Sequence, residues 1–129
     1  MIVRRAADLN GSEVDVHGPG WSSLRLLVAG DRMGFTITDV VLEPGMDQVL
    51  WYKNHLEACY CLEGEAELED LSTGTTHEIE PGTLYALDQH DRHRLRSRTR
   101  ARLICVFTPA LEGSEIHDED GSYGAPGSK

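Results

Sequence analysis

The chain has 129 residues, of which 40% are hydrophobic, and carries a formal net charge of −10 at pH 7. This length predicts a single domain, and the acidic balance disfavours nucleic acid and anionic membrane surfaces as partners. No apolar run approaches the roughly 18 residues of a membrane span, and the first residues lack the apolar segment of a signal peptide. We therefore expect a cytoplasmic protein that binds no membrane.

Short extended runs, separated by glycine and proline corners, fill most of the chain. Alternating apolar residues predict strands at 1–4, 21–28, 35–42, 49–52, 55–62, 66–71, 77–79 and 83–87, two within 92–103, and one at 103–108. This spacing, without a convincing helix, predicts an all-β sandwich or barrel at residues 1–120. The end of the chain, 121–129, is rich in glycine, serine and proline, and we expect it to be a flexible tail.

The three cysteines are predicted to be reduced. Cys59 and Cys61 are two residues apart on a predicted strand, so their side chains point the same way and a disulfide between them would be strained. The third is Cys105, and no CxxC pair is present. Reduced thiols agree with a cytoplasmic protein.

Arginine recurs at every second position from 92 to 102 and supplies half of the chain's 12 lysines and arginines. A period of two predicts that the arginines share one face of a strand pair while His93 and Leu95 point inward. A nucleic-acid stripe is one interpretation, but no aromatic residues interleave the arginines. A solvated or subunit-contacting face is the interpretation that the overall charge favours.

Glu57 lies within an otherwise apolar, alternating run. A buried, unpaired carboxylate costs several kcal/mol or becomes protonated. Glu57 therefore either faces water or meets a cation.

The spacing around Glu57 is typical of the cupin motifs G-x5-H-x-H-x3-E-x6-G and G-x5-P-x-G-x2-H-x3-N. Gly45, Glu57 and Gly64 are in register with the first motif, and Gly82 and His93 with the second. Trp51 and Lys53 stand at the two usual histidine positions of the first motif, and Asp88, His90 and Ser97 replace the Pro, Gly and Asn of the second. The chain thus resembles the cupin superfamily, a resemblance that implies a single-domain, jelly-roll-like barrel with two of four usual metal ligands missing.

A third metal ligand is needed, because one carboxylate and one imidazole hold a divalent ion poorly. Tyr85 lies on the predicted strand that leads toward His93, and a phenolate is a hard oxygen ligand that a bound metal can ionise. Glu57, Tyr85 and His93 would leave coordination positions open for a substrate. The competing interpretation is a core tyrosine and a hydrogen-bonded core histidine.

Four blocks, MIVR, YKNHLEA, YALDQHDRH and CVFTPALEGSEIHDEDGSY, resemble the ectoine synthase family from residue 1 to about 123. The resemblance implies a hydro-lyase that closes N-γ-acetyl-L-2,4-diaminobutyrate into ectoine with loss of water. It also implies a cytoplasmic homodimer that uses iron(II), with another divalent metal as the alternative. The family's metal ligands match Glu57, Tyr85 and His93.

The resemblance further implies a substrate pocket and roles within it. The matching positions are Trp21, Arg25, Tyr52, Cys105, Phe107, Glu115 and His117. Arg25 would anchor the substrate carboxylate. Glu115 or His117 would accept the amine proton, with Tyr52 as a proton relay.

Two residues depart from the family pattern. Trp51 stands where relatives often carry histidine, and Val40 where they often carry threonine. Trp51 occupies a lapsed ligand position, so we expect metal binding to survive. Val40 would cost a pocket hydrogen bond, for which Thr38 is the candidate substitute. A cupin sensor without turnover, and another iron-dependent cupin enzyme, are the alternative functions.

Overall fold

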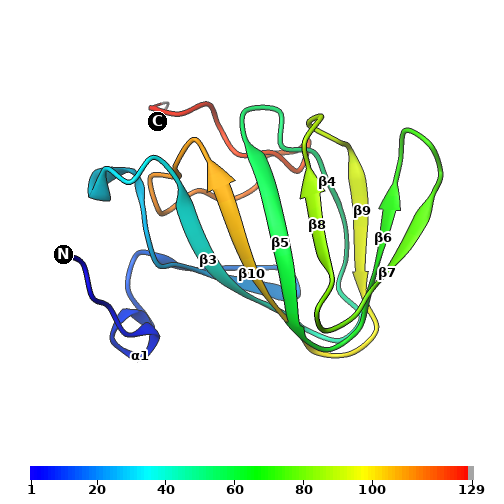
Figure 1. The fold of residues 1–129 in the computed structure, drawn as a ribbon, viewed down its shortest axis with the longest axis horizontal. Coiled ribbons are helices and arrows are strands. Elements are labelled where there is room, and N and C mark those ends of the chain that lie inside the picture. Colours follow the sequence, from blue (N-terminus) through cyan, green and yellow to red (C-terminus); the bar gives the residue numbers. More distant parts are fainter. Residues whose placement is uncertain (128–129) are drawn as a thin grey trace.

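The computed structural model describes residues 1–127 and consists almost entirely of β-strands (Figure 1). The strands are β1 (Asp15–Gly18), β2 (Trp21–Arg25), β3 (Thr36–Leu42), β4 (Asp47–Leu50), β5 (Leu56–Glu63), β6 (Ala66–Asp70), β7 (Thr76–Ile79), β8 (Leu84–Leu87), β9 (His93–Ser97) and β10 (Ala101–Thr108). A four-residue helix, α1 (Ala6–Leu9), and a 3-10 turn, η1 (Ala29–Asp31), complete the elements. The predicted all-β domain with little helix is confirmed. No helix in the described part of the chain is long and apolar enough to cross a membrane.

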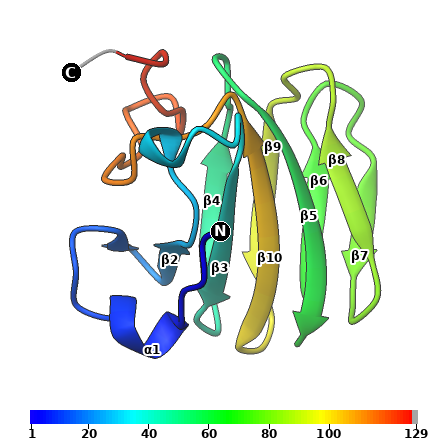
Figure 2. The same ribbon diagram turned by 60° about the vertical axis from the view of Figure 1, so that its left-hand side comes forward.

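Two antiparallel sheets enclose the core. The order is β1-β2-β3-β10-β5-β8 in the six-stranded sheet and β4-β9-β6-β7 in the four-stranded sheet. Figures 1 and 2 show β10 and β5 at the centre of one wall of the barrel, with β4, β9, β6 and β7 forming the other. Along β10 the side chains of Ala101, Leu103, Cys105 and Phe107 alternate into the core. The period of two in the sequence therefore decides which residues face the interior.

The N-terminal region differs from its prediction. Residues 1–4 form no strand and are exposed; Arg4 instead forms an ion pair with Asp31 and donates to the Leu26 carbonyl, which holds the segment away from the sheet. Between residues 4 and 21, where no strand is predicted, the structure has β1, which pairs with β2 through a turn at Pro19 and Gly20. The strand predicted at 49–52 is β4, shifted two residues earlier, because its ladder with β9 ends at Leu50 and Trp51 donates its backbone N–H to Gly121 instead.

The arginine-rich stretch is a strand pair, as its alternation predicts. His93, Leu95 and Ser97 are buried on β9, and the chain turns at 98–100 into β10. The outward arginines lie beside carboxylates: Arg94 on Asp47 and Arg102 on Asp39 are the best-defined pairs. Exposed pairs of this kind contribute on average 0 to about 1 kcal/mol each, so their main effect is to neutralise the face.

The exposed end of the chain starts later than the tail that the sequence predicts. Gly121, Ser122 and Tyr123 are buried, and Tyr123 belongs to the hydrophobic core. The aromatic ring supplies enough apolar surface to fix this stretch despite its polar neighbours. Residues 124–127 are exposed. Residues 128–129 lie outside the described part of the chain, and flexibility of the tail stays a prediction.

Candidate active site

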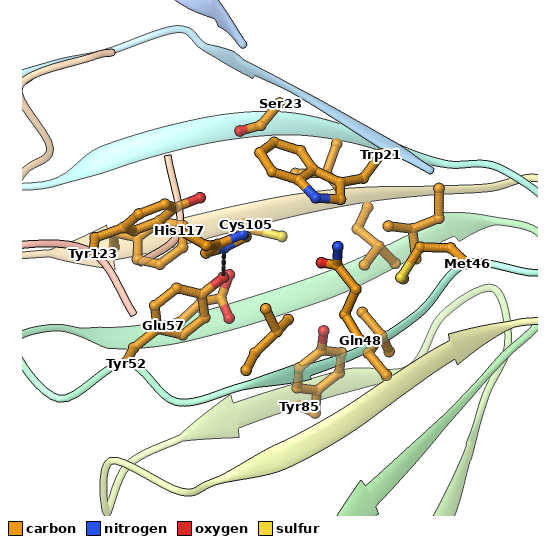
Figure 3. Close-up of a pocket in the computed structure, with 16 residues that line it drawn as sticks. Trp21, Ser23, Met46, Gln48, Tyr52, Glu57, Tyr85, Cys105, His117 and Tyr123 are labelled. Carbon is orange, nitrogen blue, oxygen red and sulfur yellow. Dashed lines mark hydrogen bonds between the residues drawn. The ribbon is translucent and has the colours of Figure 1, made fainter. Parts of the chain in front are cut away.

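A cavity between the two sheets contains most of the residues singled out in the sequence (Figure 3). Those that line it are Trp21, Tyr52, Glu57, Tyr85, Cys105, Phe107 and His117. The sheet register brings several of them together: Glu57 on β5 pairs with Phe107 on β10, and Cys59 on β5 pairs with both Cys105 on β10 and Tyr85 on β8. Since Glu57 and Cys59 are two residues apart, both point into the barrel.

Trp21 forms one wall of the cavity, and its indole fits there because the residue opposite it on β1 has no side chain. Gly18 on β1 pairs with Trp21 on β2, and a Cβ atom at Gly18 would lie 2.2 Å from the indole Cε2. A side chain at position 18 would therefore displace the indole. The ring of Trp21 then makes an edge contact with His117, at 5.0 Å between centroids.

Glu57 does not face water. Its side chain is buried, and burial raises the pKa of its carboxyl to about 8, an effect that contacts with the thiols of Cys59 and Cys105 partly offset. No ion pair to Glu57 is found among residues 1–127. A buried carboxyl of this kind is protonated at neutral pH unless a cation joins it. The sequence left two possibilities for Glu57, contact with water or contact with a cation. Since Glu57 is buried and has no cationic side chain beside it within the described residues, a metal ion is the candidate cation.

His93 presents an unused lone pair. Its Nδ1 lies 2.9 Å from the Asp91 carbonyl oxygen, and its Nε2 is buried without a hydrogen-bond partner. Burial lowers the pKa of His93, so the ring is neutral and carries its proton on Nδ1. A histidine held in this way by a carbonyl oxygen is the common second-shell arrangement of a metal ligand.

Tyr85 lies between the other two expected ligands. It lines the cavity of Glu57, and it also lines a neighbouring cavity together with His93. Burial raises the pKa of its phenol well above the usual value of 10. Glu57, Cys59 and Cys105 form a second group whose ligand atoms lie within 4.8 Å of one another. The site thus has the donors of a metal centre, and the orphaned Nε2 of His93 fits the expected set.

Tyr52 and His117 form a hydrogen-bonded pair at the rim of this site, with the Tyr52 hydroxyl 2.8 Å from the His117 Nε2 (Figure 3). Burial, together with the charge of Arg25, lowers the pKa of His117 to about 4. Burial raises the pKa of Tyr52 well above 10. At neutral pH the pair therefore consists of a neutral imidazole and a protonated phenol.

The comparisons with known proteins agree along the length of the chain. The family model described as "Ectoine synthase" matches residues 1–126. The chain belongs to the ectoine synthase family. It is 50% identical to the L-ectoine synthase of Alkalilimnicola ehrlichii over 124 residues, covering 95% of this chain and 94% of that protein. It is 46% identical to that of Oceanobacillus iheyensis, with coverage of 95% and 96%.

Solved structures of an ectoine synthase and of another cupin have the same fold as this chain. The crystal structure of ectoine synthase from P. lautus matches with a TM-score of 0.87 and 45% identity, covering 94% of this chain and 87% of that one. An RmlC-like cupin from Shewanella frigidimarina matches with a TM-score of 0.63 at 22% identity, covering 76% and 84%. At that identity the likeness speaks for the fold alone, and it confirms the predicted cupin barrel.

Arg25 is buried beside the cavity rather than in its lining. Its guanidinium donates to the Ser23 hydroxyl at 3.0 Å, the Gly113 carbonyl at 3.2 Å and the Tyr123 hydroxyl at 3.0 Å. Arginine has five N–H donors, so two remain. Its role as the carboxylate anchor in this member of the ectoine synthase family stays a prediction.

Glu115 and Thr38 are likewise outside the lining. The Glu115 carboxylate accepts from the backbone N–H groups of Glu112 and Gly113, both at 2.7 Å. Thr38 is fully buried opposite Cys105, and its hydroxyl has no hydrogen-bond partner within the described residues. The structure therefore places Tyr52 and His117 in one cavity with Glu57 and Tyr85, whereas His93 lines the neighbouring cavity beside Tyr85. It does not bring Glu115 into either cavity.

Tyr123 is a cavity residue that sequence reasoning missed. Its ring stacks on His117 at 4.7 Å with an interplanar angle of 8°, and its carbonyl accepts from Asn54. The backbone at Gly121 packs directly against β4, because a Cβ atom at Gly121 would lie only 2.4 Å from the Val49 carbonyl oxygen. The one available signal was an aromatic residue in an otherwise polar end of the chain.

Proposed function

We propose that this protein is a hydro-lyase that cyclises N-γ-acetyl-L-2,4-diaminobutyrate to ectoine with loss of one water. The observation that carries the proposal is the neutral His117–Tyr52 pair beside the buried carboxyl of Glu57. The reaction joins the substrate's α-amine to its own acetamide carbon and expels the carbonyl oxygen as water. A mostly apolar cavity with a proton acceptor suits this chemistry, because it holds the two ends together and limits the access of water.

We further propose iron(II) as the resident metal, with another divalent ion as the alternative. Glu57, Tyr85 and His93 would hold it, as the sequence resemblance implies. When bound, the ion supplies Lewis-acid polarisation of the acetamide oxygen and so stabilises charge that develops there.

The Tyr52–His117 pair handles the proton of the attacking amine. As the amine nitrogen loses a proton to the Tyr52 oxygen, the Tyr52 hydroxyl passes its own proton to the His117 Nε2, which lies 2.8 Å away. Its low pKa keeps His117 unprotonated beforehand and also makes it hold the proton only transiently, so that it can pass the proton on to the oxygen that departs as water. The rings of Trp21, Phe107 and Tyr123 surround the pair and exclude water.

Arg25 and Glu115 act from behind the residues that line the cavity. The two guanidinium N–H groups of Arg25 without a partner among residues 1–127 would bind the substrate carboxylate. Glu115 fixes the turn at Gly113, whose carbonyl in turn holds Arg25. On this proposal His117, rather than Glu115, is the base.

The deciding experiment is the incubation of iron(II)-loaded protein with the acetylated diaminobutyrate, in parallel without and with oxygen. We expect a product lighter than the substrate by one water in both, with no uptake of oxygen. Glu57→Gln is the matched control and should give no product. Binding without turnover would instead indicate a sensor module, and a product formed only with oxygen would indicate another iron-dependent cupin enzyme.

We propose that the protein acts as a homodimer in the cytoplasm, as part of the response to osmotic stress. Support for self-association comes from the outer face of the six-stranded sheet, where Tyr60, Leu62 and Leu84 are 44%, 38% and 64% exposed on adjacent strands. Exposed apolar patches of this kind mark interaction sites. Light scattering should give twice the chain mass, and Leu84→Lys should shift the protein toward the monomer; an unchanged mass would remove this face as the interface.

A further inference from the structure

A second ligand set lies inside the barrel, distinct from the one expected for iron. Glu57 and Cys59 point from β5 into the cavity region, and Cys105 stands directly opposite Cys59 on β10. One oxygen and two sulfur atoms from these residues lie within 4.8 Å of one another, and all three side chains are buried. Figure 3 shows Glu57 and Cys105 facing the same cavity.

The donors of this set differ in kind from Glu57, Tyr85 and His93. Two thiolates and a carboxylate favour thiophilic divalent ions of the zinc class, whereas oxygen and imidazole donors also suit iron(II). Ligand atoms around a tetrahedral zinc ion lie about 3.3–3.8 Å apart, given Zn–S bonds of about 2.3 Å. The separations within the cluster therefore allow one ion to be reached by small side-chain rotations.

The cysteines are suited to this role by their position. Cys59 and Cys105 are free and lie on adjacent strands near the middle of the six-stranded sheet, where the backbone ladder fixes their separation. Cys61 is also buried on the same face of β5, but its thiol lies 3.4 Å from the Glu63 carbonyl oxygen and stands outside the cluster. Cys61 can therefore serve as a control: it is a buried cysteine on the same strand that is not part of the cluster.

We propose that Glu57, Cys59 and Cys105 bind one thiophilic divalent cation of the zinc class. On binding, each thiol releases its proton to solvent, as does the Glu57 carboxyl where it is protonated. Two thiolates and one carboxylate then surround the two positive charges of the ion. Because Glu57 belongs to both ligand sets, occupation of this site displaces iron(II); this competition, but not the binding, rests on the proposed function.

Zinc-class ions have the advantage in such a competition, since their affinity for a given site exceeds that of iron(II) in the usual order of divalent metals. We expect them to inhibit cyclisation by occupying the cluster. The presence of both sets in one cavity makes metal identity, rather than metal presence alone, decide whether the enzyme is active.

Cadmium is the probe for the test, because cadmium–thiolate bonds absorb in the ultraviolet. Metal-free protein, kept reduced by a phosphine, is titrated with cadmium ions while absorbance is recorded. Wild type and the control Cys61→Ala should develop the band and saturate at one equivalent. Cys59→Ala should lack it, and its cadmium affinity should fall by more than the roughly 100-fold that loss of an outer-shell partner costs.

Cys59→Ser, which keeps the side-chain volume, serves as the second variant and must also lose the band. The proposal is overturned if wild type shows no band, if both Cys59 variants keep it, or if Cys61→Ala loses it equally. Failure of iron-loaded wild type to form product would remove the proposed function and the competition, while the absorbance titration would still decide the binding.

Discussion

The two sides of the cavity are held in place by different means. The metal side, Glu57 on β5, Tyr85 on β8 and His93 on β9, lies on strands whose ladders fix each position to its neighbours. The proton side, His117 and Tyr123, lies on a segment without regular structure, which we call the C-terminal strap (residues 112–123). Figure 1 shows this segment, in orange to red, at one end of the barrel.

The strap is held by side-chain and corner contacts instead of a ladder. Trp51 donates its backbone N–H to the Gly121 carbonyl, Lys53 pairs with Asp120 at 2.6 Å, and Arg25 binds the Tyr123 hydroxyl. Such contacts can be broken one at a time. Metal binding and proton transfer should therefore respond to different substitutions.

The largest effect is expected on the metal side. Glu57→Gln and His93→Ala should each remove bound iron, and cyclisation should fall by about 1,000-fold or more because charge on the acetamide oxygen is no longer stabilised. Metal analysis and product formation are the measurements. Full activity of a metal-free preparation would contradict this side of the comparison.

On the proton side, Tyr52→Phe should lower kcat by about 100-fold or more, since it interrupts the path to His117. The iron content should stay at the wild-type value, because no ladder contact of the metal side is changed. Loss of iron in this variant would show that the two sides are not separable.

A smaller effect is expected when the strap is loosened at Tyr123. Tyr123→Phe keeps the stack on His117 but removes the acceptor of Arg25, so KM should rise about tenfold or more, as for loss of one hydrogen bond to a charged group. Tyr123→Ala removes both contacts and should lower kcat as well. Steady-state kinetics separate the two, and identical behaviour of the variants would contradict a distinct role for the hydroxyl.

His117 should also make stability depend on pH. Its folded pKa of about 4 lies below the unfolded value of 6.5, so the unfolded state binds a proton first as pH falls. Stability that is present above pH 6.5 is then lost between about pH 6.5 and 4, by up to about 3 kcal/mol. Urea midpoints of wild type and His117→Gln should converge as pH falls from 7 to 5; parallel curves would exclude this titration.

The smallest effect is expected at the departure from the cupin motif. Trp51 is half-buried outside the cavity, with its ring 4.7 Å from the Lys53 ammonium. Trp51→Ala should leave iron content unchanged and alter activity by less than about twofold. A loss of iron in this variant would show that Trp51 contributes to metal binding after all.

Residue spacing indicated candidates for the metal side, whereas the roles of Tyr52 and His117 came from the family resemblance alone, for a physical reason. Spacing within strands sets which side chains share a face, so Glu57 and His93 followed from a period of two and the cupin register. The place of Tyr85 beside them depends on strand pairing, which its position on the strand before His93 could only suggest and which the family resemblance supported. Tyr123 is held by contacts far apart in sequence, and a polar, glycine-containing segment gave no sign that it would be buried.

The most direct measurement is the X-ray absorption spectrum of iron in the loaded wild-type protein. The central claim is that Glu57, Tyr85 and His93 hold the iron from the walls of the barrel. We predict a first shell of oxygen and nitrogen only, with scattering from one imidazole that disappears in His93→Ala. Sulfur in the first shell, or an unchanged imidazole signal in the variant, would contradict the claim.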